Sequence, residues 1–263
     1  MLVHCTNDET DINKDYSPDH AVIGDAKLVL AQLIEEVKEI LGSQTRREEP
    51  DFTEEIRSVK KGWLRQWMPK LTSDEVPINP YRVIWDLHST IDRTRSVVTH
   101  DSGSPRDQTI PFYESVTPRG FIAWGKSTQL GYSLGLAMGA KMAAPDKLAV
   151  NVIGDYGFGM VGMDMETAVR ERIPILTVIL NNASMGIYRP THFPTANELY
   201  GTKYTKGDYA KVAEALGSHT ERVEDPAQVV PAIQRSMAAV ESGLPAVLEV
   251  ITSEEPDMPY RAF

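Results

Sequence analysis

Short, continuous, β-branched segments that alternate with helical patterns constrain the fold of this chain more than any other feature. Strand-length segments without polar alternation are typical of strands buried on both faces of a parallel sheet. Four strands are predicted, at 96–99, 147–153, 174–180 and 245–251. Helical patterns cover 24–41, 56–69, a segment that begins at Asn79-Pro80, 129–143, 161–171, 207–216 and 226–241. The alternation predicts an α/β fold, with a mostly parallel sheet and helices on both faces, that binds ligands at the carboxyl ends of its strands.

The segment before this alternation is organised differently. Apolar residues recur at helical spacing and indicate an amphipathic helix that packs on another surface; they are Leu30, Leu33, Ile34, Val37 and Leu41. Residues 42–55 are polar, charged and without periodicity, and Trp63 and Trp67 share one face of the next predicted helix. The sequence therefore divides into a first segment at 1–41, a linker with a short helix at 42–75, and a main domain at 76–263.

The composition excludes several classes of function. The chain has 263 residues, of which 41% are hydrophobic, so it can bury a sizeable core. Its net charge of −10 disfavours nucleic acid as a partner, because phosphate backbones require a broad basic surface. Cys5 is interpreted as passive, since a lone cysteine permits neither an intrachain disulfide nor a thiolate zinc site. The first residues lack the features of a signal peptide, and the apolar runs are far shorter than a membrane helix. We therefore expect a soluble, cytoplasmic protein without a membrane partner.

Two predicted loops carry the chemistry. The strand at 147–153 is followed by a glycine-rich loop, 154–159, and the strand at 174–180 by 181–184, which begins with two asparagines. In a parallel sheet both loops leave the same edge, so Asp155 and Asn182 face each other if their strands are neighbours. A glycine-rich loop before a helix suits phosphate, but the carboxylate of Asp155 would repel it. A magnesium ion between them resolves this conflict, because it takes oxygen ligands and bridges a carboxylate to phosphates.

A dinucleotide-binding loop is the rival interpretation. Residues 157–162 match the G-x-G-x-x-G pattern between a strand and a helix. That fingerprint also requires an acidic residue at the end of the next strand, where this chain has Asn181 and Asn182. The glycines also begin several residues after the strand, so the sequence disfavours a nicotinamide dehydrogenase. The asparagine pair alone would be consistent with an ordinary polar turn.

Taken together, Gly154-Asp155 and Asn181-Asn182 resemble the two-part signature of thiamine diphosphate enzymes, with 24 residues between Tyr156 and Asn181. The resemblance extends over residues 76–252 and includes the runs HDSGSP, PRGFIAWGKSTQLGYSLGLAMGAK, LAVNVIGDYGFGM and RIPILTVILNNASMGIYR. The chain is most similar to the carboxy-terminal domain of the group that contains acetolactate synthase, 2-hydroxyacyl-CoA lyase and oxalyl-CoA decarboxylase. This likeness implies the thiamine diphosphate-binding fold, preceded in residues 1–41 by the last strand and helix of a middle domain.

The resemblance also implies the roles of individual residues. Asp155 and Asn182 match the side-chain ligands of Mg²⁺, and Ser184 would offer its backbone carbonyl. The residues implied at the cofactor are Gly103, Ser104, Gly154, Tyr156 and Gly157 along the diphosphate, Leu130 as the apolar support that bends the cofactor, Thr128 as a backbone contact to the aminopyrimidine, and Ile187 beside the thiazolium. An ordinary core leucine is the alternative for Leu130. Tyr156 departs from the family, which has glycine there, so the loop geometry and diphosphate binding are expected to be altered.

Relatives of this kind carry an activating glutamate on a pyrimidine-binding domain, and nothing in this sequence presents one. The resemblance therefore implies a second subunit with the pyrimidine-binding and middle domains, in a heterotetramer. The implied reaction makes or breaks a C–C bond beside a carbonyl in a 2-oxo acid or acyl-CoA substrate. The catalytic residues stay unassigned, and Tyr188 and His192 are candidates to face the substrate. FAD, where present, would bind mainly to the absent middle domain. A non-catalytic binding module and a truncated gene product are the alternatives.

Overall fold

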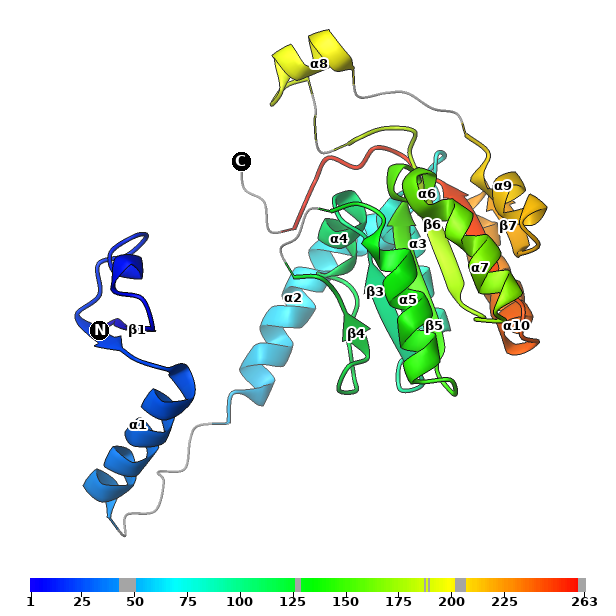
Figure 1. Ribbon diagram of the computed structural model, residues 1–263. Coiled ribbons are helices and arrows are strands. Elements are labelled where there is room, and N and C mark those ends of the chain that lie inside the picture. The colour runs from blue at the N-terminus through cyan, green and yellow to red at the C-terminus, as the bar shows by residue number, and fades with distance from the viewer. Residues whose placement is uncertain (43–50, 126–128, 187, 189, 202–206, 260–263) are drawn as a thin grey trace. The chain divides into compact units, whose positions relative to one another are not determined.

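The computed structural model describes residues 1–42, 51–125, 129–186, 188, 190–201 and 207–259. These residues form two compact units, 1–59 and 60–263, each of which is described by itself (Figure 1). No helix among the described residues is long and apolar enough to cross a membrane.

The first unit contains a two-stranded parallel sheet and a helix. Strand β1 (Val3–Thr6) pairs with β2 (His20–Ile23), a 3-10 turn η1 (Glu9–Asp11) lies between them, and α1 (Ala26–Leu41) follows. The helix begins two residues later than predicted because the side chain of Asp25 caps it, accepting from the amides of Lys27 and Leu28. Only Val29 of α1 is buried. The sequence analysis assigned one strand to this segment, whereas the structure contains two.

The second unit is built on a six-stranded sheet in the order β4-β3-β5-β6-β8-β7. The strands are β3 (Ser96–His100), β4 (Phe121–Ile122), β5 (Leu148–Gly154), β6 (Leu176–Asn181), β7 (His219–Val223) and β8 (Ala246–Ile251). All five pairings are parallel, which confirms the predicted fold class. The chain adds β4 outside β3 and later adds β6 outside β5, so the direction of winding reverses between β3 and β5.

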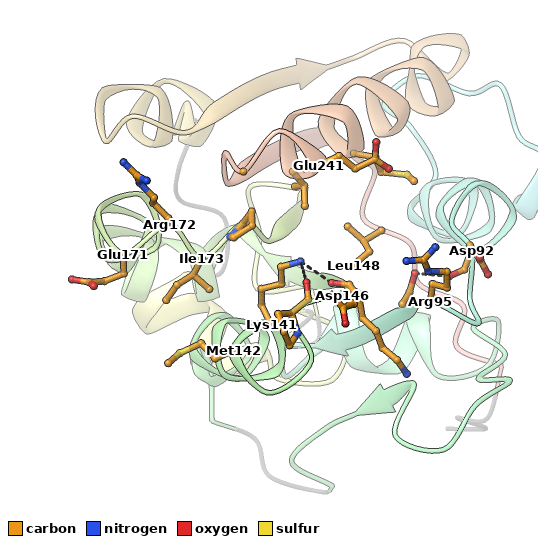
Figure 2. Close-up of a pocket in the computed structure, with 17 residues that line it drawn as sticks. Asp92, Arg95, Lys141, Met142, Asp146, Leu148, Glu171, Arg172, Ile173 and Glu241 are labelled. Atoms are coloured by element: carbon orange, nitrogen blue, oxygen red, sulfur yellow. Dashed lines mark hydrogen bonds between the residues drawn. The ribbon is translucent and has the colours of Figure 1, made fainter.

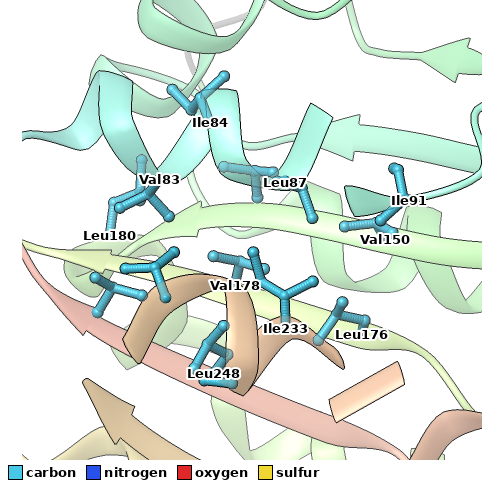
Figure 3. Packing of buried hydrophobic residues seen from close by; sticks show 14 of the residues in the cluster. Val83, Ile84, Leu87, Ile91, Val150, Leu176, Val178, Leu180, Ile233 and Leu248 are labelled. Carbon is cyan, nitrogen blue, oxygen red and sulfur yellow. The ribbon is translucent and has the colours of Figure 1, made fainter. Parts of the chain in front are cut away.

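Helices cover both faces of this sheet. The helical segments of the unit, not all of which lie on the sheet, are α2 (Thr53–Leu71, which enters this unit at Lys60), α3 (Pro80–Thr90), α4 (Ser104–Thr109), α5 (Tyr132–Ala143), α6 (Asp155–Val161), η2 (Gly162–Asp164), α7 (Met165–Arg170), α8 (Pro194–Tyr200), α9 (Tyr209–Ala215), η3 (Pro226–Gln228) and α10 (Val229–Glu241). Helices α3 and α10 cover one face, where Leu87 and Ile233 pack with Val178 and Leu248 (Figure 3). Helices α5, α6, α7 and α9 cover the other face.

The structure corrects several predicted boundaries. The segment 154–159 is not a loop, because α6 begins at Asp155 and contains Gly157 and Gly159. Glycine is a weak helix former, so tertiary contacts rather than propensity produce this helix. The predicted helix at 129–143 begins only at Tyr132, since Gly131 has a left-handed backbone with φ of 87°. Strands β4 and β7 and helices α4 and α8 were missed: they are short, and β7 carries polar side chains at an edge of the sheet.

An aromatic cluster joins α2 to the core of the second unit. The ring of Phe112 stacks on Trp63 at 5.1 Å and lies 5.5 Å from Trp67 and 5.0 Å from Tyr81. The two tryptophans lie 6.3 Å apart, as their spacing of four residues predicts. Phe112 is only 4% exposed, so its ring is the centre of these contacts.

Truncation of this central ring is therefore expected to be costly. We predict that Phe112→Ala lowers the free energy of unfolding by about 3–5 kcal/mol, since it removes buried aromatic surface and leaves a cavity. Urea denaturation followed by tryptophan fluorescence measures the change. Phe52→Ala is the control, because Phe52 is 52% exposed and its truncation should cost little. Equal losses in the two variants would contradict the packing described here.

Candidate functional site

A cavity of about 140 Å³ lies at the carboxyl ends of β3, β5 and β6. Its walls come from the segments that follow these three adjacent strands, at the point where the sheet reverses its direction of winding. Such a switch point is the usual ligand site in a parallel α/β sheet. The predicted site residues that line it are Gly103, Ser104, Leu130, Gly154, Asp155, Tyr156, Gly157, Asn182 and Ser184. Thr128 and Ile187 lie outside the described residues.

Asp155 is the buried carboxylate of this cavity. It begins α6 directly after β5 and is 3% exposed. Burial raises the pKa of Asp155 to about 6; amide groups of Tyr156 and Ala183 oppose this by donating to the carboxylate, while the negative charge of Glu249 reinforces it. Its Oδ2 atom is buried and has no hydrogen-bond partner among the described residues. A buried carboxylate oxygen without a partner is available to a cation or a donor from a ligand.

The asparagine pair forms the opposite wall. The register of β5 with β6 places Gly154 beside Leu180, so Asp155 and the turn at 181–184 leave neighbouring strands, as predicted. The amide of Ala183, which has φ of 53°, donates to Asn181 Oδ1 at 3.0 Å, and the amide of Ser184 donates to Asn182 Oδ1 at 3.0 Å. Asn181 thus builds the turn, while Asn182 lines the cavity.

The structure locates the other candidates as well. Tyr188 lines the cavity and packs edge-on against Phe193 at 5.3 Å, whereas His192 is exposed and is not one of the lining residues. Tyr156 lies within α6, so its position does not require the positive φ that favours glycine. The first five residues of the G-x-G-x-x-G pattern, 157–161, also lie in this helix rather than in a phosphate-binding loop, which further disfavours the dinucleotide interpretation.

Asp101 is a structural residue beside the cavity that was not singled out from the sequence. It follows β3, is fully buried, and accepts the amide of Gly131 on both carboxylate oxygens at 2.9 Å. A Cβ atom added to Gly157 would lie only 2.0 Å from Asp101 Oδ2. Asp101 therefore holds the start of α5 by hydrogen bonds and lies so close to Gly157 that α6 has no room for a side chain there. Its position at the end of a predicted strand was the available signal.

A larger cavity of about 980 Å³ lies at the opposite, amino-terminal edge of the sheet (Figure 2). It is open to solvent and balanced in charge, with four basic and four acidic residues. The Lys141 side chain forms hydrogen bonds within the protein, since its Nζ donates to the carbonyls of Pro145 and Lys147 at 2.7 and 2.9 Å. We place the functional site in the smaller cavity, because position in a parallel sheet is a better guide than volume.

The fold defines a parallel α/β domain with a cavity lined by polar residues at the switch point of its sheet. The family model described as "Thiamine pyrophosphate enzyme, C-terminal TPP binding domain" matches residues 101–250. The chain therefore belongs to the thiamine pyrophosphate enzymes, and the match supports thiamine diphosphate as the ligand.

Individual relatives agree with this assignment. A probable acetolactate synthase of Mycobacterium bovis is 33% identical over 198 residues, which are 73% of this chain and 35% of the relative. A probable acetolactate synthase large subunit of Methanococcus aeolicus is 26% identical over 90% of this chain and 41% of the relative. A 2-hydroxyacyl-CoA lyase of Arabidopsis thaliana is 29% identical over 95% of this chain and 44% of the relative. The chain spans about two fifths of the length of these relatives.

The close approach of Asp101 to α6 generates a prediction about Gly157. We expect Gly157→Ala to lower the free energy of unfolding by about 1–3 kcal/mol or more, because its Cβ would overlap Asp101 Oδ2. Gly159→Ala is the matched control in the same helix: its Cβ would contact Tyr209 at an ordinary 3.7 Å, and alanine favours the helix. Urea denaturation measures both. A Gly157→Ala protein as stable as the Gly159→Ala protein would contradict the described contact.

The raised pKa of Asp155 predicts a pH dependence of stability. The native carboxyl, with a pKa of about 6, binds its proton more tightly than the unfolded chain, whose pKa is about 4. The free energy of unfolding is therefore lowered by the full cost of burying the ionised carboxylate above about pH 6, and this cost disappears toward pH 4. We expect Asp155→Asn to be about 1–3 kcal/mol more stable than the wild type in denaturant melts at pH 7 without metal, and similar to it near pH 4. A pH-independent difference would contradict this assignment.

Proposed function

We propose that this chain is the diphosphate-binding subunit of an acetolactate synthase-like enzyme that makes or breaks a C–C bond beside a carbonyl. The observation that carries the proposal is the unpartnered, buried Oδ2 of Asp155, which lies in a cavity within the segment matched by the thiamine pyrophosphate family. The 2-oxo acid and acyl-CoA substrate classes are proposed by analogy with the relatives named above.

Mg²⁺ fits the polar groups of the cavity. Asp155 offers a carboxylate oxygen, Asn182 offers an amide oxygen, and Ser184 follows in the same turn with a backbone carbonyl. The described residues contain no group of three or more His, Cys, Asp or Glu that could hold a metal. The set has a single carboxylate and suits a hard cation that takes its remaining oxygen ligands from a diphosphate.

The remaining wall of the cavity suits the cofactor. Gly103, Ser104, Gly154 and Gly157 line the cavity where the diphosphate would lie, and Leu130 provides an apolar support in the same lining. Tyr156 narrows the space that a glycine would leave open, which favours altered diphosphate contacts. When bound, thiamine diphosphate supplies the nucleophile and the electron sink for cleavage beside a carbonyl. In our proposal this chain anchors the diphosphate and excludes water from it, while no residue of the chain is assigned a proton transfer.

A partner subunit completes the proposal. The chain spans 41–44% of the length of two relatives that align with at least 90% of it. Leu33, Ile34 and Val37 on α1 are 48%, 52% and 51% exposed within their own unit, which suits a surface that another polypeptide covers. We propose that a second chain in the cytoplasm supplies the pyrimidine-binding and middle domains, with the activating glutamate, in a heterotetramer.

A cofactor-holding module without catalysis is the second candidate, and Tyr156 in the cavity wall is the observation that favours it. Both candidates bind thiamine diphosphate, but only the enzyme subunit turns over a 2-oxo acid when the partner is added. Release of CO₂ or of an acyloin product by the reconstituted pair therefore separates them.

The binding proposal is tested by calorimetric titration of thiamine diphosphate into the purified chain, with and without Mg²⁺, alone and with the product of the adjacent gene. We expect Mg²⁺-dependent binding that tightens with the partner and is lost in Asp155→Ala. Asp164→Ala is the control, because Asp164 is an exposed residue of the neighbouring turn and should bind like the wild type. The absence of binding in a folded wild-type chain in both settings would overturn the proposal.

A further inference from the structure

Glu249 is a buried carboxylate that the proposed function has not used. It lies in β8, with Ile179 of β6 on one side and Arg222 of β7 on the other, and its exposed fraction is 0%. A buried charge is strongly unfavourable unless hydrogen bonds or an opposite charge compensate for it. The hydrogen-bond partners of Glu249 therefore indicate its role in the structure.

Three donors converge on Glu249. Asn181 Nδ2 donates to Oε1 at 2.6 Å, Arg222 Nη1 donates to the same oxygen at 3.2 Å, and the amide of Ala210 donates to Oε2 at 2.9 Å. These three donors are all satisfied only if both side-chain oxygens, Oε1 and Oε2, act as hydrogen-bond acceptors. The glutamine amide is a poor substitute, because its NH₂ group would have to face one of the donors.

This arrangement fixes the orientation of the Asn181 side chain. With Nδ2 held by Glu249, Oδ1 faces the amide of Ala183 at 3.0 Å. A path of hydrogen bonds thus runs from Glu249 on β8 through Asn181 to the amide of Ala183, in the turn that follows β6. Asp155 follows β5, the strand that pairs with β6, so this turn and Asp155 leave the sheet side by side.

We propose that Glu249 is a positioning residue, which holds the turn at 181–184 in the geometry in which Asp155 and Asn182 bind the divalent cation. The inference rests on the proposed function. It extends that function by placing a determinant of cation affinity on β8, away from the cavity, where Glu249 is not a lining residue. Hydrogen-bonded partners behind metal ligands commonly change metal affinity by about 10–100-fold.

The test measures the Mg²⁺ concentration that half-saturates thiamine diphosphate binding, by calorimetry on the full chain with its partner present where binding requires it. We expect Glu249→Gln to raise this concentration by about 10–100-fold. Glu224→Gln is the matched control, because Glu224 also pairs with Arg222, at 3.0 Å, but among the described residues it forms no hydrogen bond with Asn181. It should shift the concentration by less than about twofold, as expected for an exposed ion pair.

A double-variant cycle separates positioning from a general loss of stability. If Glu249 acts through Asn181, then Asn181→Ala and the double variant with Glu249→Gln will require similar Mg²⁺ concentrations. The inference would be overturned if the two substitutions multiplied each other's effect on the required Mg²⁺ concentration, or if a folded Glu249→Gln protein kept the wild-type requirement. Either result would leave the proposed function intact.

If Glu249→Gln does not fold, Glu249→Asp is used in its place. Aspartate keeps the negative charge, but its side chain is one methylene shorter, so the carboxylate lies farther from Asn181. A wild-type Mg²⁺ requirement in Glu249→Asp would then overturn the inference. A wild-type protein that shows no Mg²⁺-dependent binding at all would overturn the proposed function together with it.

Discussion

In-register parallel pairing of β5 with β6 brings Gly154 beside Leu180, so Asp155 and the turn that begins at Asn181 leave the sheet side by side. On the other side of β5, the amide of Asp101 donates to the carbonyl of Val152 at 2.8 Å and continues the pairing with β3 beyond the strand. The cavity therefore has three walls whose spacing is set by backbone hydrogen bonds. A site built this way is held by the strongest part of the fold rather than by loops.

Three buried carboxylates at the carboxyl ends of the strands differ in their hydrogen-bond partners. Asp101 accepts the amide of Gly131 at the start of α5, and Glu249 accepts one amide, one asparagine and one arginine. Of these three, Asp155 keeps its Oδ2 atom without a hydrogen-bond partner among the described residues. This difference supports our proposal that Asp155, rather than Asp101 or Glu249, binds the ligand.

The two units of the chain contrast in how well they bury their apolar surface. The sheet of the second unit has a separate core on each face. The first unit has two parallel strands and one helix, and Val29 is the only buried residue among those that the structure describes in it. Parallel strands are normally covered on both faces, so this exposure supports our proposal that another polypeptide covers the unit. This contrast agrees with relatives in which the matched segment is about two fifths of a longer chain.

The sequence by itself determined the parallel α/β class and placed Asp155 and Asn182 directly after strands, because continuous β-branched strands and polar residues at strand ends are local signals; the tertiary structure decided that these two strands are neighbours. It could not reveal that Gly157 lies in a helix against Asp101, or that Glu249 reaches Asn181 across the sheet. Those contacts join residues from separate strands, and no local spacing encodes them. Tertiary packing decided the helix at Asp155 against the low propensity of its glycines, and it alone selected which buried acid keeps an oxygen for a ligand.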